Sequence, residues 1–371
     1  MIIASEEEEG VQEPLNVESP REELDGVITR SEAFYTRSHF GVPLIDPASW
    51  SLVIENETGD GRFDVSSFRL DDLRSMPQKT ITAVLECAGN SRRAFGEPAE
   101  GEIPWGEGAV GNATWTGVQL YRLLSDKCGL SGRSTAKSVY FEGLDKKRGV
   151  GIPDSGNGLK FVRYLPIEKA LDEDTIVALQ MNGARLSSEH GFPARLVVPG
   201  WYAMASVKWL SRIRVSSQAH PYSYFNDVKY VFKQKDLNGN IVSVPLTEIR
   251  VKSIINSPIE GANLFLNKTV TIRGKSWSGS GRITRVEIKI GSDSEWLEAE
   301  MDDRLTSQLG RYAWTPWKKE WTPEKEGNVT LSVRATDERG NVQPEFPVQN
   351  FLQYGYNAQS KTTVTVRVYS P

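Results

Sequence analysis

Cys87 is the side chain of this sequence with the clearest potential for chemistry. It lies in the run Glu86-Cys87-Ala88-Gly89-Asn90-Ser91-Arg92-Arg93, where small residues would let a large ligand approach the backbone and two arginines could hold an oxyanion. The apolar run at 81–85 is typical of a buried strand, so the thiol would stand at a strand end, where sites are commonly built. A single cysteine after such a strand is most often a small buried hydrophobe, so a functional role needs support from the rest of the chain.

The elements that must position this cysteine belong to a mixed region between residues 34 and 215. Short runs rich in β-branched and aromatic residues predict strands at 50–54, 81–85, 138–141 and 195–198. Amphipathic stretches predict short helices at 68–74, 118–124 and 166–171. Gly and Pro are dense between these elements, which argues for many loops and against a regular βαβ repeat. The pattern predicts an α+β domain with a mixed sheet, which we place at residues 31–250.

A second domain is predicted at residues 251–371, where the pattern changes. The stretches 270–274, 283–290 and 329–335 alternate apolar and polar residues at period two, and short turns separate them. A region of this size is typical of an Ig-like β-sandwich. Its tryptophans are expected in core or corner packing, whereas a subset exposed on one face would mark a dimer interface or, as the weaker alternative, a carbohydrate-binding surface. They are Trp277, Trp296, Trp314, Trp317 and Trp321.

The composition excludes several classes of function. The 371 residues are 25% charged and 39% hydrophobic with a net charge of −4, so there is no electrostatic case for binding nucleic acid. No apolar run approaches the length of a membrane span. The 2 cysteines, Cys87 and Cys128, are too few for a disulfide framework, a four-cysteine zinc site or a cysteine-rich iron–sulfur site. The absence of a Cys-x-x-Cys-His motif argues against covalently attached haem.

The first 30 residues are expected to form an acidic, flexible arm, because a run of four glutamates follows Ser5 and apolar residues are few. This segment has no basic region followed by a long apolar stretch, and it has no twin arginine. We therefore expect a cytoplasmic protein, or an exported one if a leader has been removed.

Three further segments carry recognisable motifs. They are Phe-Tyr-Thr-Arg-Ser-His-Phe-Gly-Val-Pro at 34–43, His-Gly-Phe-Pro-Ala-Arg-Leu-Val-Val-Pro-Gly-Trp at 190–201 with its continuation to 210, and a stretch at 337–345 that contains Gly-Asn-Val-Gln-Pro. Together with residues 86–93, and in the same order, they resemble the sulfite oxidase family of molybdopterin enzymes over about residues 30–360. The resemblance implies a molybdenum domain followed by an Ig-like dimerisation domain, a homodimer, and no haem domain.

The resemblance also implies a molybdenum ion held by the dithiolene of one pyranopterin and by one thiolate, here Cys87. A soft thiolate suits a transition metal, and metal binding deprotonates the thiol. Arginine and lysine suit the phosphate of this cofactor, and histidine can bond its pterin. Residues 112–114 are further candidates to line the cofactor pocket, and Cys128 is expected to be structural. The cofactor-binding candidates besides Cys87 are His39, Asp145, His190, Arg195, Ser206 and Lys208.

The family's substrate pocket is a basic cavity for a small oxyanion, and Arg37 matches its substrate arginine. A second arginine follows the cysteine, but this chain has Ser91 where the family has Arg-Arg directly after Asn. Arg93 is the preferred match, and Arg92 stays open as the alternative.

Two aromatic residues and one glutamine complete the predicted substrate pocket. Trp105 matches an aromatic wall and Tyr230 matches the pocket tyrosine, although a core tryptophan and an ordinary strand tyrosine are the simpler interpretations. Gln353 stands where the animal enzymes contribute another arginine, and losing that cation would weaken anion binding by roughly 1 to 3 kcal/mol.

The function that the resemblance implies is oxidation of sulfite to sulfate by oxo transfer at the molybdenum centre. Electrons would leave to an external carrier such as a c-type cytochrome, because this chain shows no haem motif. Two alternatives stay open. One is a related molybdenum enzyme that acts on nitrate or an S-oxide, and the other is a dimeric binding protein without catalysis.

Overall fold

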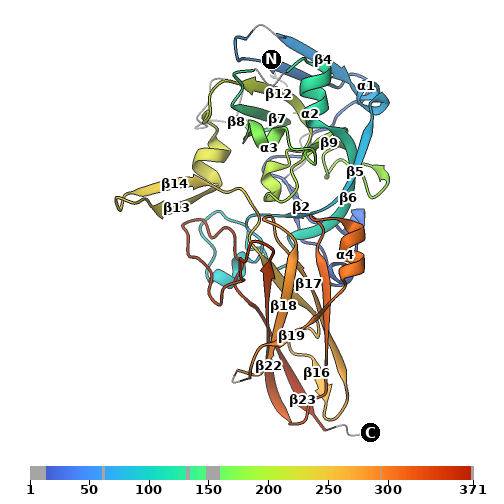
Figure 1. Cartoon of the computed structure of the whole chain (residues 1–371), viewed down its shortest axis with the longest axis vertical. Coiled ribbons are helices and arrows are strands. Elements are labelled where there is room, and N and C mark those ends of the chain that lie inside the picture. The colour runs from blue at the N-terminus through green and yellow to red at the C-terminus, as the bar shows by residue number, and fades with distance from the viewer. Residues whose placement is uncertain (1–13, 61–62, 131–133, 148–158, 293, 369–371) are drawn as a thin grey trace, which may run out of the picture.

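The structure is a computed structural model, and it describes residues 14–60, 63–130, 134–147, 159–292 and 294–368. Figure 1 shows two β-rich parts along the long axis, with the N-terminal part above and the C-terminal part below. The prediction of an α+β domain followed by an Ig-like sandwich is confirmed. Among the described residues, no helix is both long enough and apolar enough to cross a membrane.

The N-terminal part contains two five-stranded sheets. The strands of the first are β5 (Gln78–Glu86), β6 (Val110–Gln119), β9 (Ile176–Met181), β10 (Ala184–Arg185) and β11 (Arg195–Val197). Its order is β10-β9-β6-β5 with β11 beside β9, and every pairing is antiparallel. The strands of the second are β3 (Ser51–Asn56), β4 (Val65–Arg69), β7 (Ser138–Lys147), β8 (Leu159–Pro166) and β12 (Leu210–Ser216). Its order is β4-β3-β12-β7-β8, and it is mixed because β12 runs parallel to β3.

The helices are short. They are α1 (Leu70–Ser75), α2 (Leu120–Arg122), α3 (Ile167–Ala170) and α4 (Asp303–Leu309), with helical turns η1 (Arg21–Asp25), η2 (Ser31–Ala33), η3 (Arg92–Phe95), η4 (Leu123–Lys127), η5 (Ala203–Ala205) and η6 (Phe225–Lys229). Two predicted helices start later than expected, because residues 68–69 and 118–119 extend β4 and β6. Pairing with a neighbouring strand satisfies their backbone groups at once, and it outweighs a weak helix preference.

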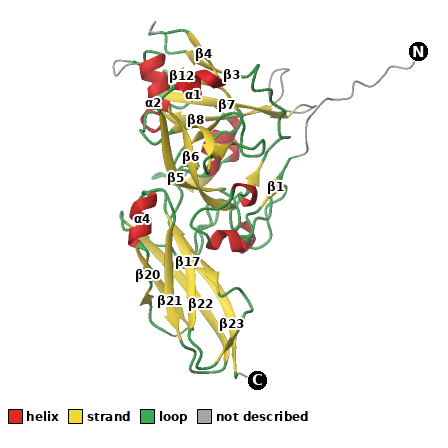
Figure 2. Cartoon of the chain, turned by 90° about the vertical axis from the view of Figure 1, so that its right-hand side faces the viewer, coloured by secondary structure: helices red, strands yellow, loops and turns green. Residues whose placement is uncertain are grey.

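The C-terminal part is a sandwich of two sheets (Figure 2). One has the order β15-β17-β21-β20 and the other β16-β23-β22-β18-β19. Their strands are β15 (Lys252–Ser257), β16 (Asn263–Phe265), β17 (Val270–Trp277), β18 (Ile283–Ile290), β19 (Leu297–Glu298), β20 (Glu300–Met301), β21 (Thr315–Trp321), β22 (Gly327–Asp337) and β23 (Ser360–Arg367). A hairpin of β13 (Val231–Lys235) and β14 (Ile241–Pro245) projects from the side of the molecule in Figure 1.

The tryptophans of the sandwich follow the core interpretation. Trp277, Trp314 and Trp317 are buried, and Trp296 lies beneath the guanidinium of Arg334 at 4.3 Å. No tryptophan is among the exposed large hydrophobic residues of the described chain, so an exposed row for carbohydrate binding is not seen.

Two contacts tie the sandwich to the strand that leads to Cys87. The backbone N–H of Gly355 donates to the carbonyl of Ala88 at 2.7 Å. The ammonium of Lys252 on β15 lies 3.0 Å from Glu86, and each of these two side chains is only 2% exposed. The neighbourhood of the thiol is therefore built from both parts of the chain.

The segment 14–30 differs from the expected flexible arm, because it packs on the body of the protein. β1 (Asn16–Val17) pairs with β2 (Thr36–Arg37), and the carboxylate of Glu18 accepts hydrogen bonds from the backbone N–H groups of Gly106 and Gly108. Leu24 is buried at 2% exposure. The acidic composition concealed these contacts, since Glu18 meets backbone donors rather than water. Residues 1–13, the rest of the expected arm, lie outside the described residues.

Candidate active site

The Cys87 thiol stands directly after β5, as the strand prediction required. Its backbone N–H donates to the carbonyl of Ala109 at 2.9 Å, and its carbonyl accepts from the N–H of Asn90 at 2.9 Å. This turn continues through Ser91, whose φ of 65° lies in the left-handed region. Burial raises the pKa of the Cys87 thiol, and a hydrogen bond from the Gly89 backbone opposes that shift.

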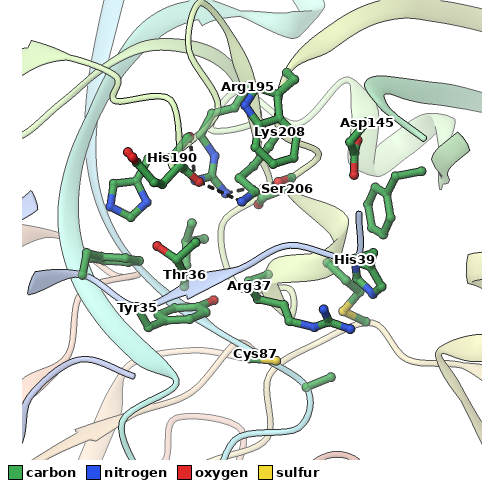
Figure 3. A pocket seen from close by; sticks show the side chains of 18 of the residues that line it. Tyr35, Thr36, Arg37, His39, Cys87, Asp145, His190, Arg195, Ser206 and Lys208 are labelled. Carbon is green, nitrogen blue, oxygen red and sulfur yellow. Dashed lines mark hydrogen bonds between the residues drawn. The ribbon is translucent and has the colours of Figure 1, made fainter. Parts of the chain in front are cut away.

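One pocket collects most of the predicted site residues (Figure 3). About 650 Å³ of space, open solvent included, lies between its walls. Its lining comes from six regions of the chain: the segment around β2, the end of β5, β7, β8, the stretch 189–209, and the residues before β13. The predicted residues that line it are Arg37, His39, Cys87, Asp145, His190, Arg195, Ser206, Lys208 and Tyr230.

One end of the pocket carries two cations, the buried Arg195 and the half-buried Lys208. Arg195 donates to the backbone carbonyls of His190 at 3.1 Å and Ser206 at 3.2 Å, and burial lowers its pKa to about 10. Lys208 donates to the carbonyl of Glu189 at 2.7 Å, and burial lowers its pKa as well. Among the described residues, neither cation forms an ion pair with a carboxylate. A charge placed in this way is costly unless a ligand supplies the opposite charge.

Two buried polar atoms at this end have no hydrogen-bond partner within the described chain. They are Oδ1 of Asp145 and Nε of Arg195. Burial raises the pKa of the Asp145 carboxyl, and the charge of Lys208 pulls it in the opposite direction. Because buried polar groups are normally bonded, these atoms indicate a place for a ligand with both donors and acceptors.

Both pocket histidines are neutral bases near pH 7. Burial lowers the pKa of His190 to about 4, so its Nε2–H donates to the Ser31 carbonyl at 2.9 Å without carrying a charge. Burial also lowers the pKa of His39, and the nearby charge of Arg37 acts in the same direction. His39 Nε2 and the Tyr230 hydroxyl share a hydrogen bond of 2.6 Å. The tyrosine predicted from the sequence therefore lies in the pocket and holds a histidine.

Arg37 lines the pocket and meets only neutral partners. Its Nη1 donates to the side chain of Asn16 at 3.1 Å and also to the carbonyl of Ser38. Its charge and that of Arg92 both act to lower the pKa of Cys87, so both guanidinium groups lie within electrostatic range of the thiol.

The predicted pair Arg93 and Trp105 does not line this pocket. Arg93 is exposed, whereas Arg92 is buried at 2% and packs against Gly89, where a Cβ would lie 2.7 Å from its Nη2. The left-handed backbone at Ser91 reverses which arginine faces inward, and sequence spacing does not reveal such a turn. Trp105 is 3% exposed in the same core cluster as Cys87, which is the simpler interpretation.

The remaining candidates also lie outside the pocket lining. Gln353 accepts a hydrogen bond from the Ala99 backbone at 3.0 Å and donates to the Glu97 carbonyl at 2.8 Å, so it fixes a loop. Residues 112–114 lie inside β6, and the side chain of Asn112 donates to the carbonyl of Val27. Cys128 is buried in the main core cluster, in accord with a structural role.

The residues present fit a molybdenum–pyranopterin. A single thiolate at Cys87 would supply the protein ligand to the metal, and the buried cations and unpaired polar atoms would meet phosphate and pterin groups. Sequence reasoning missed other lining residues, among them Tyr35, Thr36 and Met204, because a hydrophobic pattern does not separate a pocket wall from a core.

Comparisons with known proteins agree with this site. Residues 39–224 match the oxidoreductase molybdopterin binding domain, and residues 243–367 match the Mo-co oxidoreductase dimerisation domain. Mouse mitochondrial sulfite oxidase is 32% identical over 367 residues, which cover 96% of this chain and 65% of the mouse protein. The chain thus spans about two thirds of the length of that relative. Barley nitrate reductase [NAD(P)H] is 30% identical over 376 residues, covering 95% of this chain and 41% of the barley protein.

A solved structure is similar over nearly the whole chain. The sulfane dehydrogenase SoxCD of Paracoccus pantotrophus matches with a TM-score of 0.75 and 28% identity, covering 95% of this chain and 86% of that chain. The two domain matches, the relatives that match nearly the whole of this chain and the pocket around Cys87 lead to one assignment. The chain belongs to the sulfite oxidase family of molybdopterin-dependent oxidoreductases.

Proposed function

We propose that this chain oxidises sulfite, or a closely related small sulfur oxyanion, with a molybdenum–pyranopterin as its cofactor. The observation that carries the proposal is that Cys87 lines one pocket together with two kinds of group. Arg37 lies next to Cys87, and the unpaired cations Arg195 and Lys208 lie at the far end of the view (Figure 3). Tyr230 lines the same pocket.

The bound cofactor would supply two-electron oxo-transfer chemistry, and the protein supplies position and charge. Cys87 would bind the metal as a thiolate, since coordination removes the proton that burial otherwise retains. Arg195, Lys208 and Asp145 would hold the phosphate and pterin ends.

The substrate side would bind and orient an anion. Arg37 offers a guanidinium whose protein partners are neutral, so its charge is free to attract an oxyanion. The pKa of Tyr230 is raised by burial, which keeps its hydroxyl protonated and able to hydrogen-bond. His39 holds that hydroxyl in place. Electrons would pass to an external carrier such as a c-type cytochrome, and the match to a dimerisation domain supports a homodimer.

A related reaction on nitrate is the second candidate, and the similarity to barley nitrate reductase favours it. The deciding experiment is sulfite-dependent reduction of ferricyanide by purified protein with a checked molybdenum content. A parallel assay follows nitrate-dependent oxidation of a reduced viologen dye. Sulfite turnover supports the proposal, whereas nitrate turnover alone supports the second candidate, and neither activity with full molybdenum content contradicts both.

Cys87→Ser tests the role of the thiol in the same assays. We expect activity to fall below detection while the far-UV circular dichroism spectrum stays that of the parent, because a hydroxyl is a poor ligand for this metal. Cys128→Ser is the matched control, since Cys128 is a buried cysteine outside the pocket. Substantial sulfite oxidation by Cys87→Ser contradicts the ligand assignment.

A further inference from the structure

Glu102 is a buried carboxylate that no sequence motif singled out. Its side chain is 6% exposed, and it lies on the loop between η3 and β6. Oε2 is 3.1 Å from the guanidinium of Arg92, and Oε1 pairs with the ammonium of Lys229. The hydroxyl of Tyr354, from the sandwich, donates to Oε2 at 3.4 Å. One carboxylate thus joins three distant segments of the chain.

This cluster adjoins the substrate side of the pocket. The guanidinium of Arg92 packs over Gly89, two residues after Cys87, and it also faces the ring of Tyr354 at 5.0 Å. The rings of Tyr354 and Tyr230 lie 5.1 Å apart, and Tyr230 lines the pocket. The charges of Arg92 and Glu102 therefore lie behind the pocket wall, separated from the substrate space by aromatic rings and a glycine. In such a poorly solvated place, a charge acts over a longer range than in water.

The two arginines nearest the thiol differ in what neutralises them. Arg37 has neutral hydrogen-bond partners, and among the described residues no carboxylate pairs with it. Arg92 is held away from the pocket lining by Glu102 and by the carbonyl of Ile103, to which it donates at 2.7 Å. Glu102 thus offsets one of the two positive charges of Arg92 and Lys229, and it fixes the direction of Arg92.

We propose that Glu102 is a positioning residue that sets the charge selectivity of the pocket. By pairing with Arg92, it makes the site accept a monoanion, such as hydrogen sulfite, in preference to a compact dianion. A dianion would require a second free cation besides Arg37, whereas Arg195 and Lys208 are assigned to the cofactor and Arg92 is held by Glu102. This inference rests on the proposed function for the identity of the substrate, but the charge preference can be measured without turnover.

The test measures dissociation constants of sulfate, a dianion, and nitrate, a monoanion, on the molybdenum-loaded protein. Isothermal titration calorimetry at constant ionic strength and neutral pH provides both values. We expect Glu102→Gln to lower the dissociation constant of sulfate by at least about tenfold, the scale of one charge-assisted hydrogen bond. The dissociation constant of nitrate should fall by much less. Binding of sulfate that becomes detectable only in Glu102→Gln also meets this expectation. Glu100→Gln is the matched control, because it removes an exposed carboxylate from the same loop.

A second variant should change the preference for sulfate over nitrate in the opposite direction, and it keeps the test valid if Glu102→Gln does not fold. Lys229→Met removes the other cation of the cluster and leaves Glu102 to neutralise Arg92 alone. We expect this exchange to weaken the binding of sulfate more than the binding of nitrate. In an Arg92→Gln background, the Glu102→Gln exchange should no longer change the ratio of the two dissociation constants. A role that is only structural would not change this ratio, although it could alter both constants together.

An unchanged or smaller preference for sulfate in Glu102→Gln overturns the inference, as does a tightening of equal size in Glu100→Gln. Absence of sulfate binding in both the parent and Glu102→Gln also overturns it. Failure of the proposed function gives a different pattern. If sulfite is not oxidised but the ratio still shifts, the charge selectivity stands and the proposed substrate falls.

Discussion

Buried and half-buried cations surround the pocket in two kinds of place, and these differ in what neutralises the charge. Arg195 and Lys208 line the pocket without an ion-pair partner in the described chain, and Nε of Arg195 lacks any hydrogen bond. Arg92 and Lys252 lie beside the pocket, and each faces a buried carboxylate. Since an unpaired buried charge is costly, the first kind marks where a ligand belongs. The second kind holds segments of the protein together. Exchanging one cation of each kind should therefore affect stability and cofactor binding differently.

The largest effect is expected from breaking a paired cation. Lys252→Met leaves Glu86 as a buried carboxylate without its counterion, although Trp277 and Asn90 still donate to it at 2.8 and 3.0 Å. We expect the free energy of unfolding to fall by about 3 to 5 kcal/mol, measured by urea denaturation. The double exchange of Glu86→Gln with Lys252→Met should recover much of this loss. A single variant as stable as the parent would show that the pair has no structural role.

The pH dependence of stability tests whether the end of the pocket that holds Arg195 and Lys208 keeps His190 unprotonated. The folded-state pKa of His190, about 4, lies below the ordinary value of 6.5, because of burial and the charges of Arg195 and Lys208. The unfolded state therefore binds more protons in this range, and stability present above about pH 6.5 is lost as pH falls toward 4.

For the cofactor-free protein, this side chain alone should account for a loss of up to about 3 kcal/mol between neutral pH and pH 4. His190→Gln should flatten the dependence by that amount in urea denaturation at several pH values. His220→Gln, an exchange of an exposed histidine, is the control. An equally steep dependence in His190→Gln would contradict the assignment.

Removing an unpaired cation should reduce cofactor binding and leave stability nearly unchanged, whereas removing Lys252 should reduce stability. Lys208→Met removes a desolvated charge that Arg195 and Arg37 repel, so the cofactor-free protein should unfold within about 1 kcal/mol of the parent. Retention of molybdenum after dialysis should fall by about tenfold, because a contact to the cofactor is lost. Lys169→Met is the control, as Lys169 forms an ion pair with Asp172 outside the pocket. A strong loss of stability with normal metal content would remove the distinction between the two kinds of cation.

The smallest effect concerns the neutral partner of Arg37. Asn16→Ala removes one hydrogen bond to that guanidinium, at 3.1 Å. We expect KM for sulfite to rise about threefold to tenfold, and kcat to change by less than twofold, since the charge itself remains. Steady-state kinetics give both values. Asn328→Ala, which removes a side-chain hydrogen bond with Thr365 in the sandwich, provides a control for loosening of the fold. A fall in kcat alone would assign Asn16 a different role.

The sequence predicted the sheets better than the loops. Period-two alternation at 270–274, 283–290 and 329–335 located β17, β18 and β22, because one face of each strand is buried in the sandwich. The helices at 68–74 and 118–124 were predicted to start two residues too early, since strand pairing took their first residues. The packing of residues 14–30 on the body of the protein was missed, because the hydrogen bonds that Glu18 accepts from the backbone N–H groups of Gly106 and Gly108 leave no hydrophobic pattern.

The site residues were predictable where a sequence motif fixes the backbone. They were not predictable where the conformation of a turn determines which side chain faces the pocket. Nine predicted residues line the pocket, because the segments at β2, β5 and β7, the stretch 189–209 and the residue before β13 place them there. Arg93 and Gln353 depend on left-handed backbone at Ser91 and at Gln353 itself, with φ of 65° and 55°. Glu102 joins Arg92, Lys229 and Tyr354, which are distant in sequence, so no local spacing could indicate it.

The hydrogen bond from Gly355 to the carbonyl of Ala88 has a consequence for how this protein can be altered. The peptide next to the proposed metal ligand is held by a loop of the other domain, so the two domains cannot be exchanged as independent modules. A chimera that joined this N-terminal part to a foreign sandwich would bring a new loop against residues 86–93. Gene fusion or recombination in the connection between β14 and β15 would therefore need a 350–357 loop that still reaches the carbonyl of Ala88.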